Sequence, residues 1–435
     1  MITDNDRKID SLEKCGETDI IIVGAGLSGL SCAQHLMKEN VPFVLLEADH
    51  RIGGRLKTEN VEGFLLNYGF QVLQTAYPEA RRLLDYDRLE LKPFAPGAMI
   101  RIEGRFYRVS DPIRRPGDLW STLTAPIGSI GDRLRILHLA HHVRRATVSD
   151  LFRAPDVPTL DFLRSERFSE KIIQRFFRPF FAGVCLDPDI GASSRVFRYI
   201  LRVFSQGDVA LPSRGMEAIA RQLAEGLPEE KIRTGAKVAS VSRREVVLKS
   251  GERIRGRAVV FATEGPETVR LLNSSEILPS RGEQCLYFSS PKPPIAEPFL
   301  ILNGSGKGWV NSVTVPSVVA PSYSPDGQEL ISVVVIGGLS ADDASVEQKV
   351  RRELTDWFGP EVEDWRHLKT IRISHALPEQ PSPMPDPTKP MAGVKHGIYI
   401  CGEYNSVPGI QWALLSGRQT AERILKDHSF SGPTQ

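Results

Sequence analysis

Residues 20–29 read IIIVGAGLSG and residues 43–47 read FVLLE. The first run is a short apolar strand that ends in a glycine-rich turn, and a helix is expected to follow from Leu30 to Met37. The second run is another apolar strand, which closes on the acidic residue Glu47. A strand, a glycine turn, a helix and a second strand ending in an acid together predict an α/β unit that binds a dinucleotide.

The residue type at each position of this unit suits a specific role in backbone geometry or cofactor binding. Gly24 permits a tight turn, Gly26 lets the backbone approach a pyrophosphate, and Gly29 lets the helix pack close to the sheet. The unpaired N–H groups at the start of the helix favour bound phosphates. Glu47 lies about 20 residues beyond the glycines, where a carboxylate can accept hydrogen bonds from both hydroxyls of an adenosine ribose.

The overall composition is typical of a soluble globular protein. The chain has 435 residues, of which 41% are hydrophobic and 25% charged, so two or three domains are expected. A net charge of +2 gives no indication of nucleic acid as a partner. There is no run of about 18 apolar residues and the N-terminus lacks an apolar signal core, so we expect a cytoplasmic protein without a transmembrane helix. The five cysteines are scattered, which favours buried or incidental thiols over a disulfide framework or a zinc site.

A second glycine pair decides between nicotinamide and flavin cofactors. Residues 51–55 read RIGGR, in which bare backbone can lie against an extended cofactor and a guanidinium can neutralise its pyrophosphate. The segment resembles the Arg-x-Gly-Gly-Arg signature of the FAD-dependent amine oxidase, protoporphyrinogen oxidase and phytoene desaturase superfamily. Residues 65–71, LLNYGFQ, are similar to the "Asp-x-Gly-x-x" stretch of that superfamily, with Asn67 where an acid is commoner.

Two later segments extend the resemblance. Residues 211–216, LPSRGM, resemble the Pro-x-Gly-Gly-Met segment of the superfamily, with Arg214 replacing its first glycine. Residues 397–403, GIYICGE, and the helix expected after residue 409 resemble the closing motif, in which Gly-Asp contacts the ribityl chain and phosphate. Glu403 stands here for the usual Asp, and the resemblance implies that the start of the following helix points at the flavin.

The resemblance implies FAD as the cofactor, and it also gives the backbone at position 238 a contact with the adenine ring. No metal site and no catalytic side chain are identified. The candidate cofactor-binding residues are Gly24, Ala25, Gly26, Leu27, Ser28, Gly29, Glu47, Ala48, Gly53, Gly54, Arg55, Val238, Gly402, Glu403, Ile410 and Gln411.

We expect an α/β fold with a Rossmann-type FAD-binding domain and a mixed α+β substrate domain, both discontinuous in sequence. The substrate domain is expected to have a helical part and an antiparallel-sheet part, and the sheet part carries β-rich runs between about residues 284 and 336. The expected divisions are a polar leader over 1–18, an FAD-binding domain over 19–94, 208–280 and 378–430, and a substrate domain over 95–207 and 281–377.

The helical stretch from 132 to 204 combines arginines with phenylalanines at helical spacing. Helices are expected over 132–147 and 169–182, and Pro179 should kink or end the second one. A core-facing aromatic stripe with solvated arginines is the favoured interpretation, and a basic aromatic surface resting on a membrane is the alternative. His138 and His142 have the i, i+4 spacing of a metal pair, but no nearby acid or cysteine completes a ligand set.

The resemblance implies an FAD-dependent oxidoreductase that removes a hydride from an apolar small molecule, as phytoene desaturases or protoporphyrinogen oxidases do. A flavin amine oxidase is the first alternative, although no acidic amine-binding cluster is evident and Lys307, between two glycines, indicates an exposed turn. A non-catalytic lipid-binding protein on the same fold, similar to the Rab GDP-dissociation inhibitors, is the second. Peripheral contact with a membrane, the electron acceptor and the oligomeric state stay open.

Overall fold

The computed structural model describes residues 16–275, 278–337, 339, 341–389, 397–403 and 406–428. The chain divides into two compact units, each built from separate chain segments. Unit 1 draws on residues 1–55, 219–278 and 389–435, and unit 2 on residues 56–218 and 279–388. The first change of unit therefore falls after residue 55, whereas the sequence placed the first domain boundary after residue 94.

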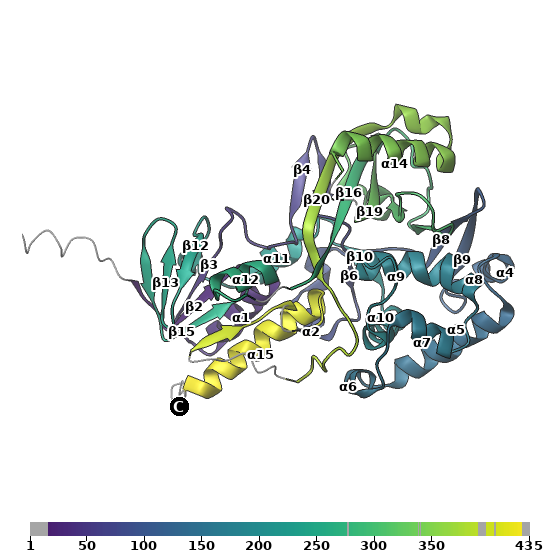
Figure 1. Cartoon of the computed structure of the whole chain (residues 1–435). Coiled ribbons are helices and arrows are strands. Elements are labelled where there is room, and N and C mark those ends of the chain that lie inside the picture. The colour runs from purple at the N-terminus through teal and green to yellow at the C-terminus, as the bar shows by residue number, and fades with distance from the viewer. Residues whose placement is uncertain are drawn as a thin grey trace, which may run out of the picture. The chain divides into compact units, whose positions relative to one another are not determined.

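A parallel sheet forms the centre of unit 1 (Figure 1). Its strand order is β11-β3-β2-β15-β21, with the bounds Ile232–Arg233, Phe43–Leu46, Ile20–Val23, Ala258–Phe261 and Ile398–Ile400. All residues of β2 and β15 are buried, as expected for strands covered on both faces. Strand β2 leads through helix α1 (Leu27–Lys38) to β3 on one side, and β15 pairs with β2 on the other side. The carboxyl ends of β2 and β15 therefore flank a topological switch point, where ligands bind in open α/β sheets.

Two long helices of unit 1 pack against each other. They are α1 (Leu27–Lys38) and α15 (Ile410–His428). The Ser31 hydroxyl donates to the carbonyl oxygen of Leu414 at 2.7 Å, and a Cβ on Gly417 would lie 2.3 Å from the carbonyl oxygen of Ser28. This close approach holds the N-terminal and C-terminal segments of unit 1 together.

A second sheet of unit 1 has the order β1-β14-β13-β12, with the bounds Gly16–Glu17, Arg253–Arg255, Glu245–Leu248 and Val238–Val241. Apolar side chains of both sheets meet in one core, which includes Ile21 and Phe261 from the first sheet and Val246 and Ile254 from the second. Helix α12 (Gly265–Leu271) contributes Leu271 to this core.

Unit 2 is built on a seven-stranded sheet in the order β20-β16-β19-β18-β17-β8-β9 (Figure 1). The strands span, in that order, Arg366–Pro378, Ser280–Ser290, Glu329–Ile336, Ser312–Thr314, Leu300–Asn303, Gly97–Ile102 and Arg105–Ser110. All neighbours pair antiparallel except β17 and β8, which are parallel. The expected antiparallel sheet is therefore a mixed one, because the hairpin β8-β9 joins it through a parallel edge.

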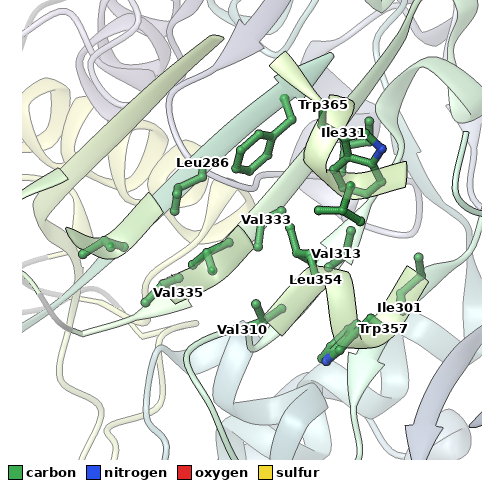
Figure 2. Close-up of a cluster of buried hydrophobic side chains, with 14 residues drawn as sticks. Leu286, Ile301, Val310, Val313, Ile331, Val333, Val335, Leu354, Trp357 and Trp365 are labelled. Carbon is green, nitrogen blue, oxygen red and sulfur yellow. The ribbon is translucent and has the colours of Figure 1, made fainter. Parts of the chain in front are cut away.

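Helix α14 (Asp343–Phe358) covers one face of this sheet, and Figure 2 shows Leu354 and Trp357 of the helix among the strand residues that they contact. Its buried residues Val346, Val350, Leu354 and Trp357 recur every three or four positions, which is the apolar stripe of an amphipathic helix. Alternate residues of the strands, such as Ile331 of β19, complete the core.

Short elements complete unit 2. A hairpin pairs β4 with β5, and a small sheet has the order β6-β10-β7. The strands β4, β5, β6, β7 and β10 span Thr58–Val61, Phe64–Asn67, Leu73–Gln74, Lys92–Pro93 and Val209–Leu211. The helices α2, α3 and α13 span Pro78–Leu83, Tyr86–Leu89 and Pro316–Val319, and α11 spans Glu217–Ala224 across the change of unit.

The helical part of unit 2 contains both helices expected from the sequence. Its helices α4 to α10 span Leu119–Thr124, Ile130–Arg145, Val148–Arg153, Thr159–Ser165, Glu170–Ile172, Arg178–Cys185 and Ser194–Gln206. Pro179 does not end its helix, because the chain stays helical to Cys185, and the expected kink stays a prediction. A π-helical turn over Ile173–Phe177 directly precedes Pro179, which then lies in the first turn of α9, where a backbone N–H is not required.

Most of the aromatic stripe of this region faces the core, as the favoured interpretation predicted, whereas Phe176 and Phe180 stay partly exposed. Phe177, Phe181 and Phe197 are buried, with ring centroids of Phe181 and Phe197 4.4 Å apart. The arginines, however, are more than a solvated face. Arg202, for example, donates to the carbonyl oxygens of Val143, Arg144 and Ala146, because the last carbonyls of α5 lack partners within the helix.

Four cysteines, Cys32, Cys185, Cys285 and Cys401, are buried free thiols, and Cys15 lies outside the described residues. In the part of the chain that the structure describes, no helix is long and apolar enough to cross a membrane.

Candidate cofactor site

The glycine turn after β2 is shaped by two close approaches. A Cβ on Gly24 would lie 2.6 Å from the carbonyl oxygen of Ala262, and Gly24 has a φ of +105°. A Cβ on Gly29 would lie 2.0 Å from the carbonyl oxygen of Gly24. Both glycines are therefore needed for α1 to pack onto the sheet.

Gly26 differs from these two glycines, since a Cβ there would meet nothing within 4 Å. Gly26 is the N-cap of α1, no side chain caps the helix, and its first turn contains no acidic residue. Unpaired N–H groups and the positive end of the helix dipole thus face open space, which is the arrangement that binds a phosphate group.

The second glycine pair lies directly against the first motif. Gly53 donates its backbone N–H to the carbonyl oxygen of Ala25 at 2.8 Å, and a Cβ on Gly54 would lie 3.3 Å from the Cα of Gly26. Gly54 has a φ of +59°, which favours glycine. The two motifs therefore form one continuous surface of bare backbone.

Backbone groups fix the carboxylate of Glu47 beside this surface. Its Oε2 accepts from the N–H of Ala25 at 2.8 Å and its Oε1 from the N–H of Asp49 at 2.9 Å. Each carboxylate oxygen can accept more than one hydrogen bond, so both keep capacity for a ribose hydroxyl. Ala48, next in the chain, is exposed.

The C-terminal motif reaches the same helix start. A Cβ on Gly402 would lie 3.4 Å from the Ser28 hydroxyl oxygen, and the Gly402 N–H donates to the Ser416 hydroxyl at 2.9 Å. Glu403 forms an ion pair with Arg55. Burial raises the pKa of Glu403, and the adjacent guanidinium of Arg55 opposes that shift.

The remaining candidates lie in the same unit. Gly409 has a φ of +121° and precedes Ile410 and the buried Gln411 at the start of α15. The carbonyl oxygen of Val238 accepts from Nη2 of Arg270 at 2.9 Å, and its side chain packs in the core. All the cofactor-binding residues proposed from the sequence thus fall in unit 1.

The fold and the site together define an α/β protein of the dinucleotide-binding class, in which the Gly53-Gly54 pair lies against the glycine turn of residues 24–29. The profile of the "Flavin containing amine oxidoreductase" family matches residues 27–425. The chain belongs to this family, and its class is that of the FAD-dependent oxidoreductases.

Individual relatives are distant. Protoporphyrinogen oxidase 2 of Arabidopsis thaliana is 27% identical over 172 residues, which cover 39% of this chain and 33% of that relative. A 15-cis-phytoene desaturase of Solanum lycopersicum is 21% identical over 470 residues, covering 95% of this chain and 78% of the relative. The structure of cyclohexylamine oxidase from Brevibacterium oxydans has a TM-score of 0.70 at 16% identity, covering 95% of this chain and 99% of that chain. The match to the plant oxidase thus spans about a third of its length, and the structural likeness shows the shared fold.

Asn67 ties three segments of unit 2 together. Its amide oxygen accepts from the Thr58 hydroxyl at 2.8 Å and from the N–H of Met216 at 3.1 Å, and its amide nitrogen is 3.3 Å from the Tyr323 hydroxyl. An amide offers both a donor and acceptors, whereas an ionised acid offers acceptors alone. Asn67 uses both of these capacities, accepting from Thr58 and Met216 and donating to Tyr323.

Sequence reasoning missed two polar residues of β16. The buried carboxylate of Glu283 accepts from the N–H of Phe70, and burial raises the pKa of Glu283 to about 7 although that hydrogen bond opposes the shift. The Tyr287 hydroxyl donates to the carbonyl oxygen of Asn67 at 2.7 Å. Both side chains hold the stretch around Gly69. The β-rich runs were expected only from about residue 284, and the polar residues 280–284, SRGEQ, give no apolar pattern that would have placed Glu283 in a buried strand.

In many amine oxidases of the superfamily a lysine and an aromatic pair frame the amine, and the possible counterparts in this chain are Lys307, Trp309, Tyr404 and Trp412. Lys307 is exposed in the loop between β17 and β18, as its flanking glycines predicted. The ring of Trp309 lies 4.3 Å from the ammonium group of Lys349. Trp412 is buried in α15, and Tyr404 lies outside the described residues.

His138, His141 and His142 are exposed on α5. Within the described ranges, no group of three or more His, Cys, Asp or Glu residues could hold a metal ion.

Proposed function

We propose that this protein binds FAD at the surface around Gly26 and uses it to remove a hydride from an apolar small molecule. A bound flavin supplies the two-electron acceptor for such a reaction. The open start of α1 would hold the pyrophosphate, and the Glu47 carboxylate would accept hydrogen bonds from the adenosine ribose. The start of α15 at Ile410 and Gln411 would stabilise negative charge at the pyrimidine edge of the ring.

The observation that carries the apolar substrate class is a set of aromatic rings in unit 2. Phe176 and Phe180 stack with centroids 6.0 Å apart and planes 5° apart, and Phe204 meets Phe180 edge to face at 5.1 Å. These three rings stay partly exposed, although their neighbours Phe177 and Phe181 are buried. Partly exposed aromatic faces suit a polyene or a macrocycle, since contact removes apolar area from water without leaving polar groups unpaired. Peripheral contact with a membrane would bring such a substrate to the protein.

The test is anaerobic titration of the purified FAD-bound protein with 15-cis-phytoene, a porphyrinogen, putrescine, cyclohexylamine and L-amino acids, followed by loss of the visible absorbance of oxidised flavin. Bleaching by the polyene or the porphyrinogen is expected. Phe180→Leu should slow this bleaching about tenfold, because part of the ring contact is lost. The matched control is Phe358→Leu, which removes another partly exposed, stacked ring and should leave the rate unchanged. Bleaching by amines alone would overturn the proposal that the substrate is apolar. A protein that takes up no FAD would overturn the proposal that the protein is a flavin enzyme.

A flavin amine oxidase is the second candidate, and Glu283 is the observation that favours it. This carboxylate is buried and forms no ion pair within the described part of the chain, so an ammonium group of a substrate could partner it. Glu283→Gln should then abolish bleaching by amines. Under the first proposal the same variant keeps its reaction with the apolar substrate.

A further inference from the structure

The second sheet of unit 1 carries an unusual concentration of positive charge. Residues 231–257, which contain its strands β12, β13 and β14, include nine lysines or arginines and two acids, which gives 9 − 2 = +7. The whole chain has a net charge of only +2, so the residues outside this segment carry 2 − 7 = −5 in total. The excess of positive charge is therefore concentrated in one short part of the chain.

Most of these cations lie on the side of the sheet that faces solvent. Val246, Leu248 and Ile254 point into the core, so the residues that alternate with them along the strands point away from it. The side chains of Arg253 and Arg255 are 60% and 55% exposed. We call this side of the sheet, with the turn between β12 and β13, the basic face; its exposed cations are Lys237, Arg243, Arg244, Lys249, Arg253 and Arg255.

Two lysines of the basic face lie directly beside each other. The N–H of Lys249 donates to the carbonyl oxygen of Lys237 at 2.8 Å, one position beyond the paired residues Val238 and Leu248. Like charges at such neighbouring positions destabilise a sheet. Neither lysine forms an ion pair within the part of the chain that the structure describes. An anionic partner would relieve this repulsion.

The arginines of this segment already bind carboxylates of their own chain. Glu245 accepts from Arg253 at 2.9 Å and from Arg255 at 3.1 Å. Arg233 donates two hydrogen bonds to Glu252, of 2.8 and 2.6 Å. A guanidinium group matches the geometry of a carboxylate, so the remaining donors suit acidic side chains of a partner.

We propose that the basic face docks an acidic surface of a separate protein. Complementary charge of this kind steers a partner to its site and selects against partners of the wrong sign. A continuous row of phosphates fits less well, because Glu245 lies between Arg253 and Arg255 and would repel it, whereas separate carboxylates can pair with the cations around it. The docking surface is independent of the flavin chemistry.

Other occupants lack a matching feature in this segment. Residues 231–257 contain no Phe, Tyr or Trp, so there is no aromatic platform on which single-stranded nucleic acid could stack. None of the exposed large hydrophobic side chains among the described residues falls in this segment, so it offers a bilayer no apolar anchor. A second copy of the chain would have to supply its acids from residues that carry only −5 in total.

The test is a titration of labelled poly-L-glutamate, as a probe for an acidic protein surface, with the FAD-bound full chain, followed by fluorescence anisotropy. The probe should bind, and its affinity should fall at least about tenfold between about 20 and 200 mM NaCl, because salt screens exposed charges. Arg244→Glu/Lys249→Glu should also lose at least about tenfold in affinity. Its matched control is Arg105→Glu/Lys171→Glu, which makes the same change of charge at exposed positions of unit 2 and should bind as wild type.

A second variant separates the charge of the basic face from its folding. Arg244→Lys/Lys249→Arg keeps both charges and should bind the probe as wild type does. Retained FAD and an unchanged melting temperature verify each variant. Failure of the wild type to bind the probe, equal binding by the double glutamate variant, or tighter binding of oligo(dT) than of poly-L-glutamate of equal charge would each overturn the proposal. Self-association of the wild type that the double glutamate variant relieves, measured by analytical ultracentrifugation, would also overturn it.

Discussion

Arg55 and Glu403 form an ion pair although 348 residues separate them. The arginine was expected to neutralise a pyrophosphate, and the structure shows that it also compensates a largely buried carboxylate at the C-terminal motif. The pair joins the second glycine motif to the segment that leads into α15. If Arg55 also contacts the pyrophosphate, as we propose, cofactor binding and the assembly of unit 1 depend on the same guanidinium.

Replacement of Arg55 by alanine should weaken FAD binding about tenfold and lower the free energy of unfolding of the apoprotein by about 1–3 kcal/mol, because it leaves the Glu403 carboxylate without its cation. Glu403→Gln keeps the arginine for the phosphates and should bind FAD more tightly than Arg55→Ala does. FAD titration by flavin fluorescence and urea unfolding give the two quantities. Wild-type affinity in Arg55→Ala would contradict the pyrophosphate role.

Substitutions at two glycines of the first motif should affect different properties, FAD affinity at Gly26 and stability of the fold at Gly29. Gly26→Ala places a methyl group in open space, so the apoprotein should unfold within about 0.5 kcal/mol of wild type, whereas FAD affinity should fall at least about tenfold. Gly29→Ala forces a Cβ against the Gly24 carbonyl oxygen and should destabilise the fold by about 3 kcal/mol or more. Thermal unfolding of the two variant apoproteins measures the change in stability, and FAD titration measures the change in affinity. Equal stability losses would show that Gly26 too is structural.

The Asp132 carboxylate should contribute strongly to the stability of the helical part of unit 2. Burial alone would raise its pKa, but hydrogen bonds from Ser169 and Ser129 outweigh it and lower the pKa to about 2. Because the folded-state pKa is depressed, the stabilisation is complete above the ordinary value near 4 and is lost as pH falls towards 2. Asp132→Asn should therefore cost about 2 kcal/mol at neutral pH and progressively less in acid. Asp150 occupies the same position in the capping box of α6 but is exposed, so Asp150→Asn should cost less. If urea unfolding shows equal losses of stability for Asp132→Asn and Asp150→Asn, the special role of Asp132 is wrong.

Glu283 should give the opposite pH dependence. Its folded-state pKa is raised to about 7, so the folded protein binds more protons than the unfolded chain between about pH 4.5 and pH 7, and stability falls as pH rises through that window. The loss attributable to this group is about 3 kcal/mol. Glu283→Gln should match wild type near pH 5 and exceed its stability near pH 8, whereas Glu361→Gln, at an exposed position, should follow wild type throughout. Parallel urea-unfolding profiles for wild type and Glu283→Gln would rule this out.

The dinucleotide unit could be predicted because its signals are contiguous. The strand Ile20–Val23, the turn at Gly24 and the strand Phe43–Leu46 are each set by local sequence, and the structure confirms all three elements. Pro179 shows a limit of local reasoning, since a proline allows either a helix end or a kinked continuation. In the structure a π-helical turn precedes Pro179 and the chain stays helical to Cys185.

The glycine turn and the acid after β3 followed from the sequence alone, since close backbone approach admits only glycine and the period of apolar residues identifies strands and helices. The family resemblance of the motifs added the flavin. Tertiary structure alone decided which charged groups meet, as Arg55 meets Glu403 and Glu283 meets the Phe70 N–H. It also decided which apolar stripe of α5 is buried, because Leu134 and Leu139 are equally hydrophobic in sequence and only packing against the rest of unit 2 distinguishes them. Burial and ion pairing are properties of neighbours in space, which the order of residues along the chain does not specify.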